Sequence, residues 1–436
     1  MHSNPLQSAR RKGRHEIREL LRERDFRRLL GAQFVSQAAD GLAQGVAGAV
    51  LVLDPLESGT PERIFVLFAQ TLLPYSLISP FLGVFVDRWD RKKLLIGTLL
   101  LRAALLVTLP AWSQTTSQDQ ALMLAVLGLL GLGRLFSTTK GAVIPVVLHE
   151  HHLLRGNTLS SIVGFIAALS GGVVGLGISG TMGPALALAL VGLCYVPGAL
   201  AARGIGEFLG HPPRAAVPLV SDIGRVAREL AQGVREVWRR PGTRWPLTSI
   251  FLLRVSAIVV VIAAILIIKA EFPGDSGDLG RKVSGGVLLG LSGVGGFLAS
   301  FSAPSLGRYL SKPALIILGF VVSGVAVAGF GGFTSVIPVG AVMLIGGFGS
   351  FITKVSVDAQ VQEALPDDYR GRAFALYDIL YNVASVTAAA IVVGVADFSV
   401  TTWLVGTGVA TLACAAALAA VMSRSGMLMP RVAADS

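Results

Sequence analysis

Long apolar runs separated by short polar connections dominate this chain of 436 residues. A membrane-spanning helix needs about 20 mostly apolar residues, and backbone groups in hydrocarbon must be hydrogen-bonded internally, which favours helices. The pattern therefore predicts an all-α membrane protein with twelve transmembrane helices. The expected spans are Leu29–Leu53, Ile64–Val86, Leu94–Trp112, Ala121–Leu148, Leu159–Ser179, Ala185–Ala202, Pro246–Ile268, Gly285–Ala303, Ala314–Phe333, Pro338–Val357, Phe374–Val395 and Thr401–Met422.

The longest polar connection, residues 204–244, separates two groups of six spans. Between Val220 and Trp238, apolar residues recur every three or four positions, which predicts an amphipathic helix on the cytoplasmic membrane surface. A regulatory or partner-binding helix is the alternative. The expected domains are a basic leader (1–28), an N-terminal six-helix bundle (29–203), the linker (204–244), a C-terminal six-helix bundle (245–423) and a tail (424–436).

The two halves show weak internal similarity. Several residues between Phe81 and Ile96 match residues between Phe301 and Ile316 at one fixed offset, and Arg155-Gly156 corresponds to Arg370-Gly371 at a slightly shorter one. Transporters that rock one half against the other are often built from such repeats. The matches therefore favour a duplicated six-span unit.

Composition supports burial in a membrane. Hydrophobic residues make up 53% of the chain and charged residues 14%, against about 25% charged in soluble proteins. The net charge of +11 would suggest nucleic acid in a soluble protein. The positive residues, however, gather before the first span, after the second, in the linker and after the last. The positive-inside rule then places both termini in the cytoplasm of a cell-membrane protein, and no nucleic-acid partner is expected.

Signatures of enzyme chemistry are missing from the sequence. It has no Gly-x-x-x-x-Gly-Lys-Ser/Thr nucleotide loop, no His-Glu-x-x-His and no Cys-x-x-Cys. Cys194 and Cys414 lie in apolar runs and are expected to pack there. His149, His151 and His152 flank Glu150 and could bind a metal, but no second ligand set is visible. No enzymatic activity, cofactor or metal site is expected.

The turn after the second span reads Gly83-Val84-Phe85-Val86-Asp87-Arg88-Trp89-Asp90-Arg91-Lys92-Lys93. It resembles the signature loop of the major facilitator superfamily, in which an aspartate follows a glycine by four residues and a basic cluster comes next. The resemblance implies two six-helix bundles around a central cavity and a cytoplasmic gate. In that gate the aspartate pairs with the basic cluster and faces the N-terminal end of the eleventh helix. The gate residues implied here are Gly83, Asp87, Arg88, Arg91, Lys92, Gly371 and Arg372.

Ionisable residues inside spans are costly and usually functional. Asp40, in the first span, is a candidate for proton coupling or cation contact; a hydrogen-bonded packing role is the alternative. Arg134 in the fourth span and Arg254 in the seventh are its candidate partners. Lys354 and Asp358 are one helical turn apart, and their spacing favours a local pair.

Four further segments are similar to the drug-exporter branch related to macrolide-efflux and enterobactin-export proteins. The resemblance implies proton-driven export of a hydrophobic or amphipathic small molecule by alternating access, carried out by a monomer. A nutrient importer of the same fold is an alternative; a lipid translocase or a polytopic membrane enzyme would belong to another class. The segments are Arg24–Leu29, Gln37–Gly41, Pro145–Asn157 and Pro366–Arg372.

Overall fold

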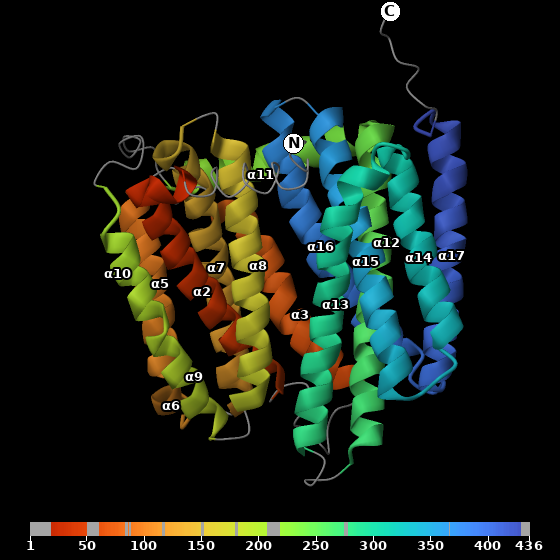
Figure 1. Cartoon of the computed structure of the whole chain (residues 1–436), viewed down its shortest axis with the longest axis horizontal. Helices are drawn as coiled ribbons and strands as arrows, with labels where there is room; N and C mark the ends of the chain where they lie inside the picture. Colours follow the sequence, from red (N-terminus) through yellow and green to blue (C-terminus); the bar gives the residue numbers. More distant parts are fainter. Residues whose placement is uncertain are drawn as a thin grey trace, which may run out of the picture. The chain divides into compact units, whose positions relative to one another are not determined.

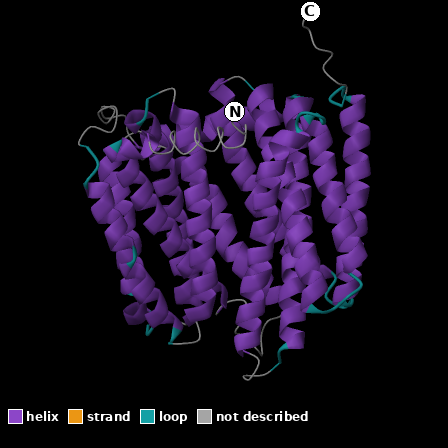
Figure 2. Cartoon of the chain, viewed as in Figure 1, coloured by secondary structure: helices purple, strands orange, loops and turns teal. Residues whose placement is uncertain are grey.

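All regular elements in the described part of the chain are helices, with no strand among them (Figure 2). The computed structural model describes residues 19–49, 61–82, 86, 89–115, 118–149, 152–178, 182–206, 219–273, 278–365 and 367–428. The all-α prediction is confirmed.

Each expected span corresponds to a helix or to a pair of short helices (Figure 1). In the first half these are α2 (Arg24–Gly48), α3 (Pro61–Ile78) with the 3-10 turn η2 (Ser79–Phe81), α5 (Arg91–Val107) with α6 (Leu109–Trp112), α7 (Gln118–Val147), α8 (Leu153–Ile178) and α9 (Pro184–Leu193) with α10 (Tyr195–Arg203). The linker forms α11 (Leu219–Arg239). The second half contains α12 (Pro241–Glu271), α13 (Asp278–Leu306), α14 (Lys312–Phe330), α15 (Val336–Ala364), α16 (Asp367–Gly394) and α17 (Val400–Arg424).

Ten helices or helix pairs in the described part of the chain are long and apolar enough to cross a membrane. The other two expected spans are α2 and α5 with α6. In α2, Gln33, Gln37 and Asp40 interrupt the apolar residues, and α5 is only 17 residues long. Polar content thus singles out α2 among the spans.

The helices form two compact units. The first contains α2 and α5 to α10, and the second contains α3 and α11 to α17. Although α3 comes second in the chain, its Ile64 shares a core with Ile258, Val392 and Trp403, which lie on α12, α16 and α17. The domain boundaries suggested by the sequence remain a prediction.

In the first unit, α2 and α8 lie side by side with their backbones in contact (Figure 1). A methyl group added at Gly41 would overlap the carbonyl oxygen of Ala168, and one added at Gly175 would overlap that of Leu42. Small residues permit this approach between membrane helices. Gly41 of α2 and Gly175 of the fifth span therefore serve close packing.

In the second unit, glycines bring α13 and α15 equally close, with Gly295 against the carbonyl of Leu344. The predicted linker helix is present as α11. One of its faces is buried there: Val237 is fully buried in a core shared with Leu247 and Leu365, and Gly233 lies against the side chain of Arg372. The linker helix is therefore packed on the second unit.

Candidate functional site

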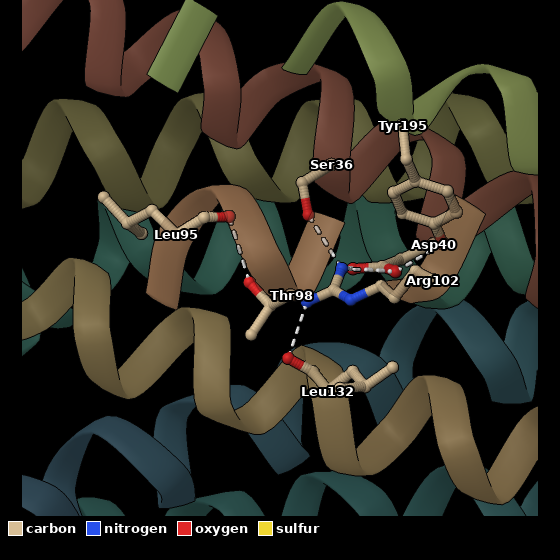
Figure 3. A network of polar contacts seen from close by, with 7 residues as sticks. All are labelled: Ser36, Asp40, Leu95, Thr98, Arg102, Leu132 and Tyr195. Carbon is tan, nitrogen blue, oxygen red and sulfur yellow. Dashed lines mark hydrogen bonds and ion pairs between the residues drawn. The ribbon is translucent and has the colours of Figure 1, made fainter. Parts of the chain in front are cut away.

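An ion pair lies inside the first unit, between α2 and α5 (Figure 3). Nη1 of Arg102 is 2.9 Å from Oδ1 of Asp40 and 3.0 Å from Oδ2. The Arg102 side chain is fully buried, whereas 21% of the Asp40 side chain is exposed. The carboxylate is thus the accessible member of the pair.

The Arg102 guanidinium also holds neighbouring helices. Nη1 donates to the Ser36 hydroxyl at 2.8 Å, and Nη2 donates to the Leu132 carbonyl on α7 at 2.9 Å. Its carbon lies 5.4 Å from the centroid of the Phe136 ring and 5.5 Å from that of Tyr195, distances at which aromatic rings attract a cation. Arg102 therefore connects α5 with α2, α7 and α10.

Tyr195 donates its phenolic hydrogen to Oδ1 of Asp40 at 2.7 Å. It is the first residue of α10, directly after the interruption of the sixth span. Pro197 explains this interruption, because its nitrogen cannot donate to the carbonyl of Leu193, and Cys194 bonds instead to the carbonyl of Val191. The break is therefore next to the residue that binds Asp40.

The helices that carry the pair are fixed near their first turns. Asp25 of α2 accepts a hydrogen bond from the Gly206 amide at 3.1 Å, and Arg28 donates to the Gly204 carbonyl. The Asp90 side chain caps α5 by accepting from the Lys93 amide at 2.9 Å, an arrangement that satisfies an otherwise unpaired helix donor. These contacts hold the start of α2 against the segment after α10 and define where α5 begins.

The ion-pair partner differs from the one expected. The sequence suggested Arg134 or Arg254 for Asp40, but the structure places Arg102 there. Arg134 is half-buried on α7, and Arg254 belongs to the second unit. The prediction was wrong because position within a span does not reveal which side of the helix a residue occupies.

In the second unit, Arg254 contacts neutral groups of α16. Its Nε donates to the Ser385 hydroxyl at 3.1 Å, and its guanidinium carbon lies 4.1 Å from the centroid of the Tyr381 ring. On α15, Lys354 donates to Asp358 at 2.7 Å, which confirms the predicted local pair. The proton-coupling roles suggested for Asp40, Arg134 and Arg254 stay predictions.

The predicted cytoplasmic gate is only partly covered by the described residues. Gly83, Asp87 and Arg88 lie outside them. Arg91 donates to the Ala142 carbonyl of α7 at 3.2 Å, and Lys92 follows it in the first turn of α5. Gly371 and Arg372 lie near the start of α16, where Arg372 is 3.9 Å from Glu229 of α11. The gating roles of these residues remain predictions.

Two further cations, Arg102 and Lys140, lie inside predicted spans and were not among the expected site residues. Each is a charge within an apolar run, and that was the available signal. Lys140 of α7 donates to the Ser160 hydroxyl of α8 at 3.2 Å. The first unit thus contains a second polar cluster around Lys140.

The histidine-rich loop adds no metal centre within the described residues. No group of three His, Cys, Asp or Glu side chains there is placed to hold an ion. Glu150 and His151 of this loop lie outside that part of the chain.

Comparison with known proteins identifies relatives along most of the sequence. The family model of the Major Facilitator Superfamily matches residues 29–389. An uncharacterised transporter of this type from Mycobacterium tuberculosis is 28% identical over 388 residues, which cover 84% of each chain. Macrolide efflux protein A of Enterococcus faecalis is 33% identical over 93 residues, covering 19% of this chain and 26% of that protein.

Solved transporter structures share the fold at low sequence identity. A POT family transporter in complex with a thioalcohol-conjugated peptide has a TM-score of 0.67 at 11% identity, covering 91% of this chain and 96% of its own. The nucleoside transporter NupG has a TM-score of 0.64 at 14% identity, covering 91% and 98%. A bacterial homologue of the human lysosomal transporter Spinster has a TM-score of 0.63 at 13% identity, covering 93% and 98%. The chain belongs to the major facilitator superfamily and is a multi-pass membrane transporter.

Proposed function

We propose that this transporter exports a hydrophobic or amphipathic small molecule and that the proton gradient drives export through the Asp40–Arg102 pair. The observation that carries the proposal is a carboxylate inside a membrane span that is partly exposed and held by a fully buried arginine. Ionisable groups at such depth commonly mark proton or substrate pathways. The partial similarity to macrolide efflux protein A supports the direction of transport.

Protonation of Asp40 would change the packing of the first unit. With the carboxylate neutral, Arg102 would keep its charge but lose its counter-ion. Removing one partner of a buried pair costs about 3–5 kcal/mol. Because Arg102 also bonds to α7 and Asp40 accepts from Tyr195 of α10, the helices would adjust to offset that cost. Proton binding is thereby coupled to a rearrangement of α2, α5, α7 and α10.

The proposed transport cycle also needs a cytoplasmic gate and a defined orientation in the membrane. With both termini in the cytoplasm, Asp87 and Arg91 would close the cytoplasmic side against the start of the eleventh helix near Gly371, as the signature loop implies. Arg134 of α7 would pair with the substrate. The protein would work as a monomer in the cell membrane.

The test is to replace Asp40 with Asn. Cells that produce the protein are first screened for export of macrolides and other amphipathic compounds, and the compound exported fastest is followed in proteoliposomes under an imposed pH gradient. We expect Asp40→Asn to abolish pH-driven accumulation while exchange of substrate down its own gradient continues, because the proton acceptor is lost but the binding site remains.

Asp358→Asn is the matched control, since it removes a carboxylate from a pair within one helix. It should retain pH-driven transport. Undiminished pH-driven flux in Asp40→Asn would remove Asp40 from the mechanism, and accumulation in the opposite direction would show an importer.

A further inference from the structure

A second polar cluster joins three helices of the first unit. Lys140 of α7 donates to the Ser160 hydroxyl of α8 at 3.2 Å. That hydroxyl donates in turn to Oε1 of Gln33 on α2 at 2.7 Å, and Nε2 of Gln33 donates to Oε1 of Gln37 and to the Ser160 carbonyl, each at 2.7 Å. The Ser160 hydroxyl therefore donates its hydrogen to Gln33 and accepts a hydrogen bond from the Lys140 ammonium group through an oxygen lone pair.

The cluster is built into the helix packing. Gln33 and Ser160 are only 1% and 2% exposed, whereas Lys140 is partly exposed. A methyl group at Gly164 would overlap the amide oxygen of Gln37 and lie 2.6 Å from Nε2 of Gln33. The glycine therefore makes room for both amides. Lys140 and Gln37 are thus the partly exposed members of the cluster, and Gln33 and Ser160 are its buried ones.

Lys140 lies well before the end of its helix. It lies seven residues before α7 ends at Val147, about 10 Å deep at 1.5 Å per residue. Ser160 lies seven residues after α8 begins at Leu153, and a short connection joins these two helix ends. Since the hydrogen-bonded partners are equally deep, the lysine points sideways between the helices. It does not extend toward the interface, as long basic side chains near helix ends commonly do.

Lys140 is paired differently from the other intramembrane lysine. Lys354 donates to the Asp358 carboxylate. Among the described residues, Lys140 bonds only to a neutral hydroxyl. The six predicted spans of the first half contain three cations, Arg102, Arg134 and Lys140, and one anion, Asp40. A charge within the membrane is costly without a counter-ion, so an anion at Lys140 would be favourable.

We propose that Lys140 binds the acidic group of the transported molecule, so the substrate is an amphipathic organic anion carrying a carboxylate or phosphate. An oxyanion would accept hydrogen bonds from the ammonium group, which has three donors and spends one on Ser160. The apolar part of the molecule would lie against apolar helix surfaces. This inference rests on the proposed transport function and specifies its substrate class.

The experiment measures binding to the purified full-length protein in nanodiscs of zwitterionic lipid, without a pH gradient. Two fluorescent probe pairs are used: pyrenebutyric acid with its primary amide, and the lipid-like dansylundecanoic acid with its amide. We expect the wild type to bind a carboxylate about 10- to 100-fold more tightly than the matched amide, the range expected for a hydrogen bond to a charged group. Tighter binding of pyrenebutyric acid than of its amide indicates a water-soluble substrate. Tighter binding of dansylundecanoic acid than of its amide indicates a substrate that comes from the bilayer.

Lys140→Gln should remove the preference and leave amide binding unchanged, while Lys140→Arg should retain it. Lys354→Gln is the matched control, since it removes a lysine elsewhere in the membrane, and should behave as wild type. Ser160→Asp keeps the lysine but supplies an internal carboxylate, so it should also remove the preference. The proposal is overturned if the wild type prefers neither carboxylate, or if the preference survives in Lys140→Gln or Ser160→Asp. Because no proton gradient is involved, a failure of proton coupling at Asp40 would leave these results unchanged.

Discussion

The cations inside the predicted spans of the two units have different kinds of partner. In the first unit, Arg102 of α5 pairs with the Asp40 carboxylate of α2 and is fully buried. In the second unit, Arg254 lies over the Tyr381 ring and bonds to the Ser385 hydroxyl. Lys354 forms an ion pair with Asp358 of the same helix.

This difference predicts different effects of protonation in the two units. Neutralising Asp40 removes a contact between α2 and α5 and leaves a fully buried charge behind. Neutralising Asp358 releases a contact within α15 and leaves a lysine whose side chain is 45% exposed. Neutral partners such as an aromatic ring and a hydroxyl keep their attraction for Arg254 when nearby carboxylates titrate. A titration in the first unit is thus the one that should move helices.

The largest effect is expected for Arg102→Gln. It leaves the Asp40 carboxylate without its counter-ion, at a cost of about 3–5 kcal/mol, so the thermal unfolding temperature of the purified protein should fall sharply and transport should be lost. The double variant Asp40→Asn/Arg102→Gln should recover part of the stability, because neither charge is then left unpaired. A double variant no more stable than Arg102→Gln would show that the pair is not coupled.

A smaller effect is expected for Arg254→Gln. It removes a cation–π contact at 4.1 Å, worth about 0.5–2 kcal/mol, and breaks no ion pair among the described residues. Tyr381→Leu should destabilise the protein by a similar amount, and the two changes should not be additive. A loss as large as that of Arg102→Gln would remove the contrast between the units. Thermal unfolding of the same preparations provides the measurement.

The smallest effect is expected for Asp358→Asn. An ion pair one helical turn apart contributes about 0.2–0.5 kcal/mol, and Lys354 also lies 5.7 Å from the centroid of the Tyr377 ring. At every pH between 5 and 8, the unfolding temperature of Asp358→Asn should stay close to that of the wild type. A clear pH dependence that disappears in Asp358→Asn would place a titrating site in the second unit as well.

The helices could be predicted from the sequence, but the partner of Asp40 could not. Apolar run length located the helices, the three-to-four-residue periodicity located α11, and one-turn spacing identified the Lys354–Asp358 pair. The depth of each arginine along its predicted span did not identify which one pairs with Asp40. Counted from the predicted cytoplasmic ends at 1.5 Å per residue, Asp40 lies about 17 Å deep, Arg102 and Arg254 about 12 Å, and Arg134 about 21 Å. All three depths are compatible with a long side chain.

Arg102 pairs with Asp40 because α5 lies next to α2 and is rotated so that this side chain faces it. Both the neighbouring helix and its rotation result from helix packing, which the sequence pattern does not reveal directly. The approach of α2 to α8 depends on several glycines acting together, and the break before Tyr195 depends on a proline in the sixth span. The glycines and the proline determine which helix faces contact each other. Their effect can be interpreted only when the neighbouring helices have been identified, as they are in the structure of the first unit.

The order in which the chain is made bears on the Asp40–Arg102 pair. The two residues are 62 positions apart, so at about 5–20 residues per second of synthesis the carboxylate precedes its counter-ion by roughly 3 to 12 s. The glycine face of α2 waits still longer for α8. During this interval the predicted span Leu29–Leu53 is an isolated segment with one charge and three glutamines, a weak candidate for stable insertion by itself. The newly made first span should therefore depend on the insertion machinery, or on a chaperone beside it, until its later partners arrive.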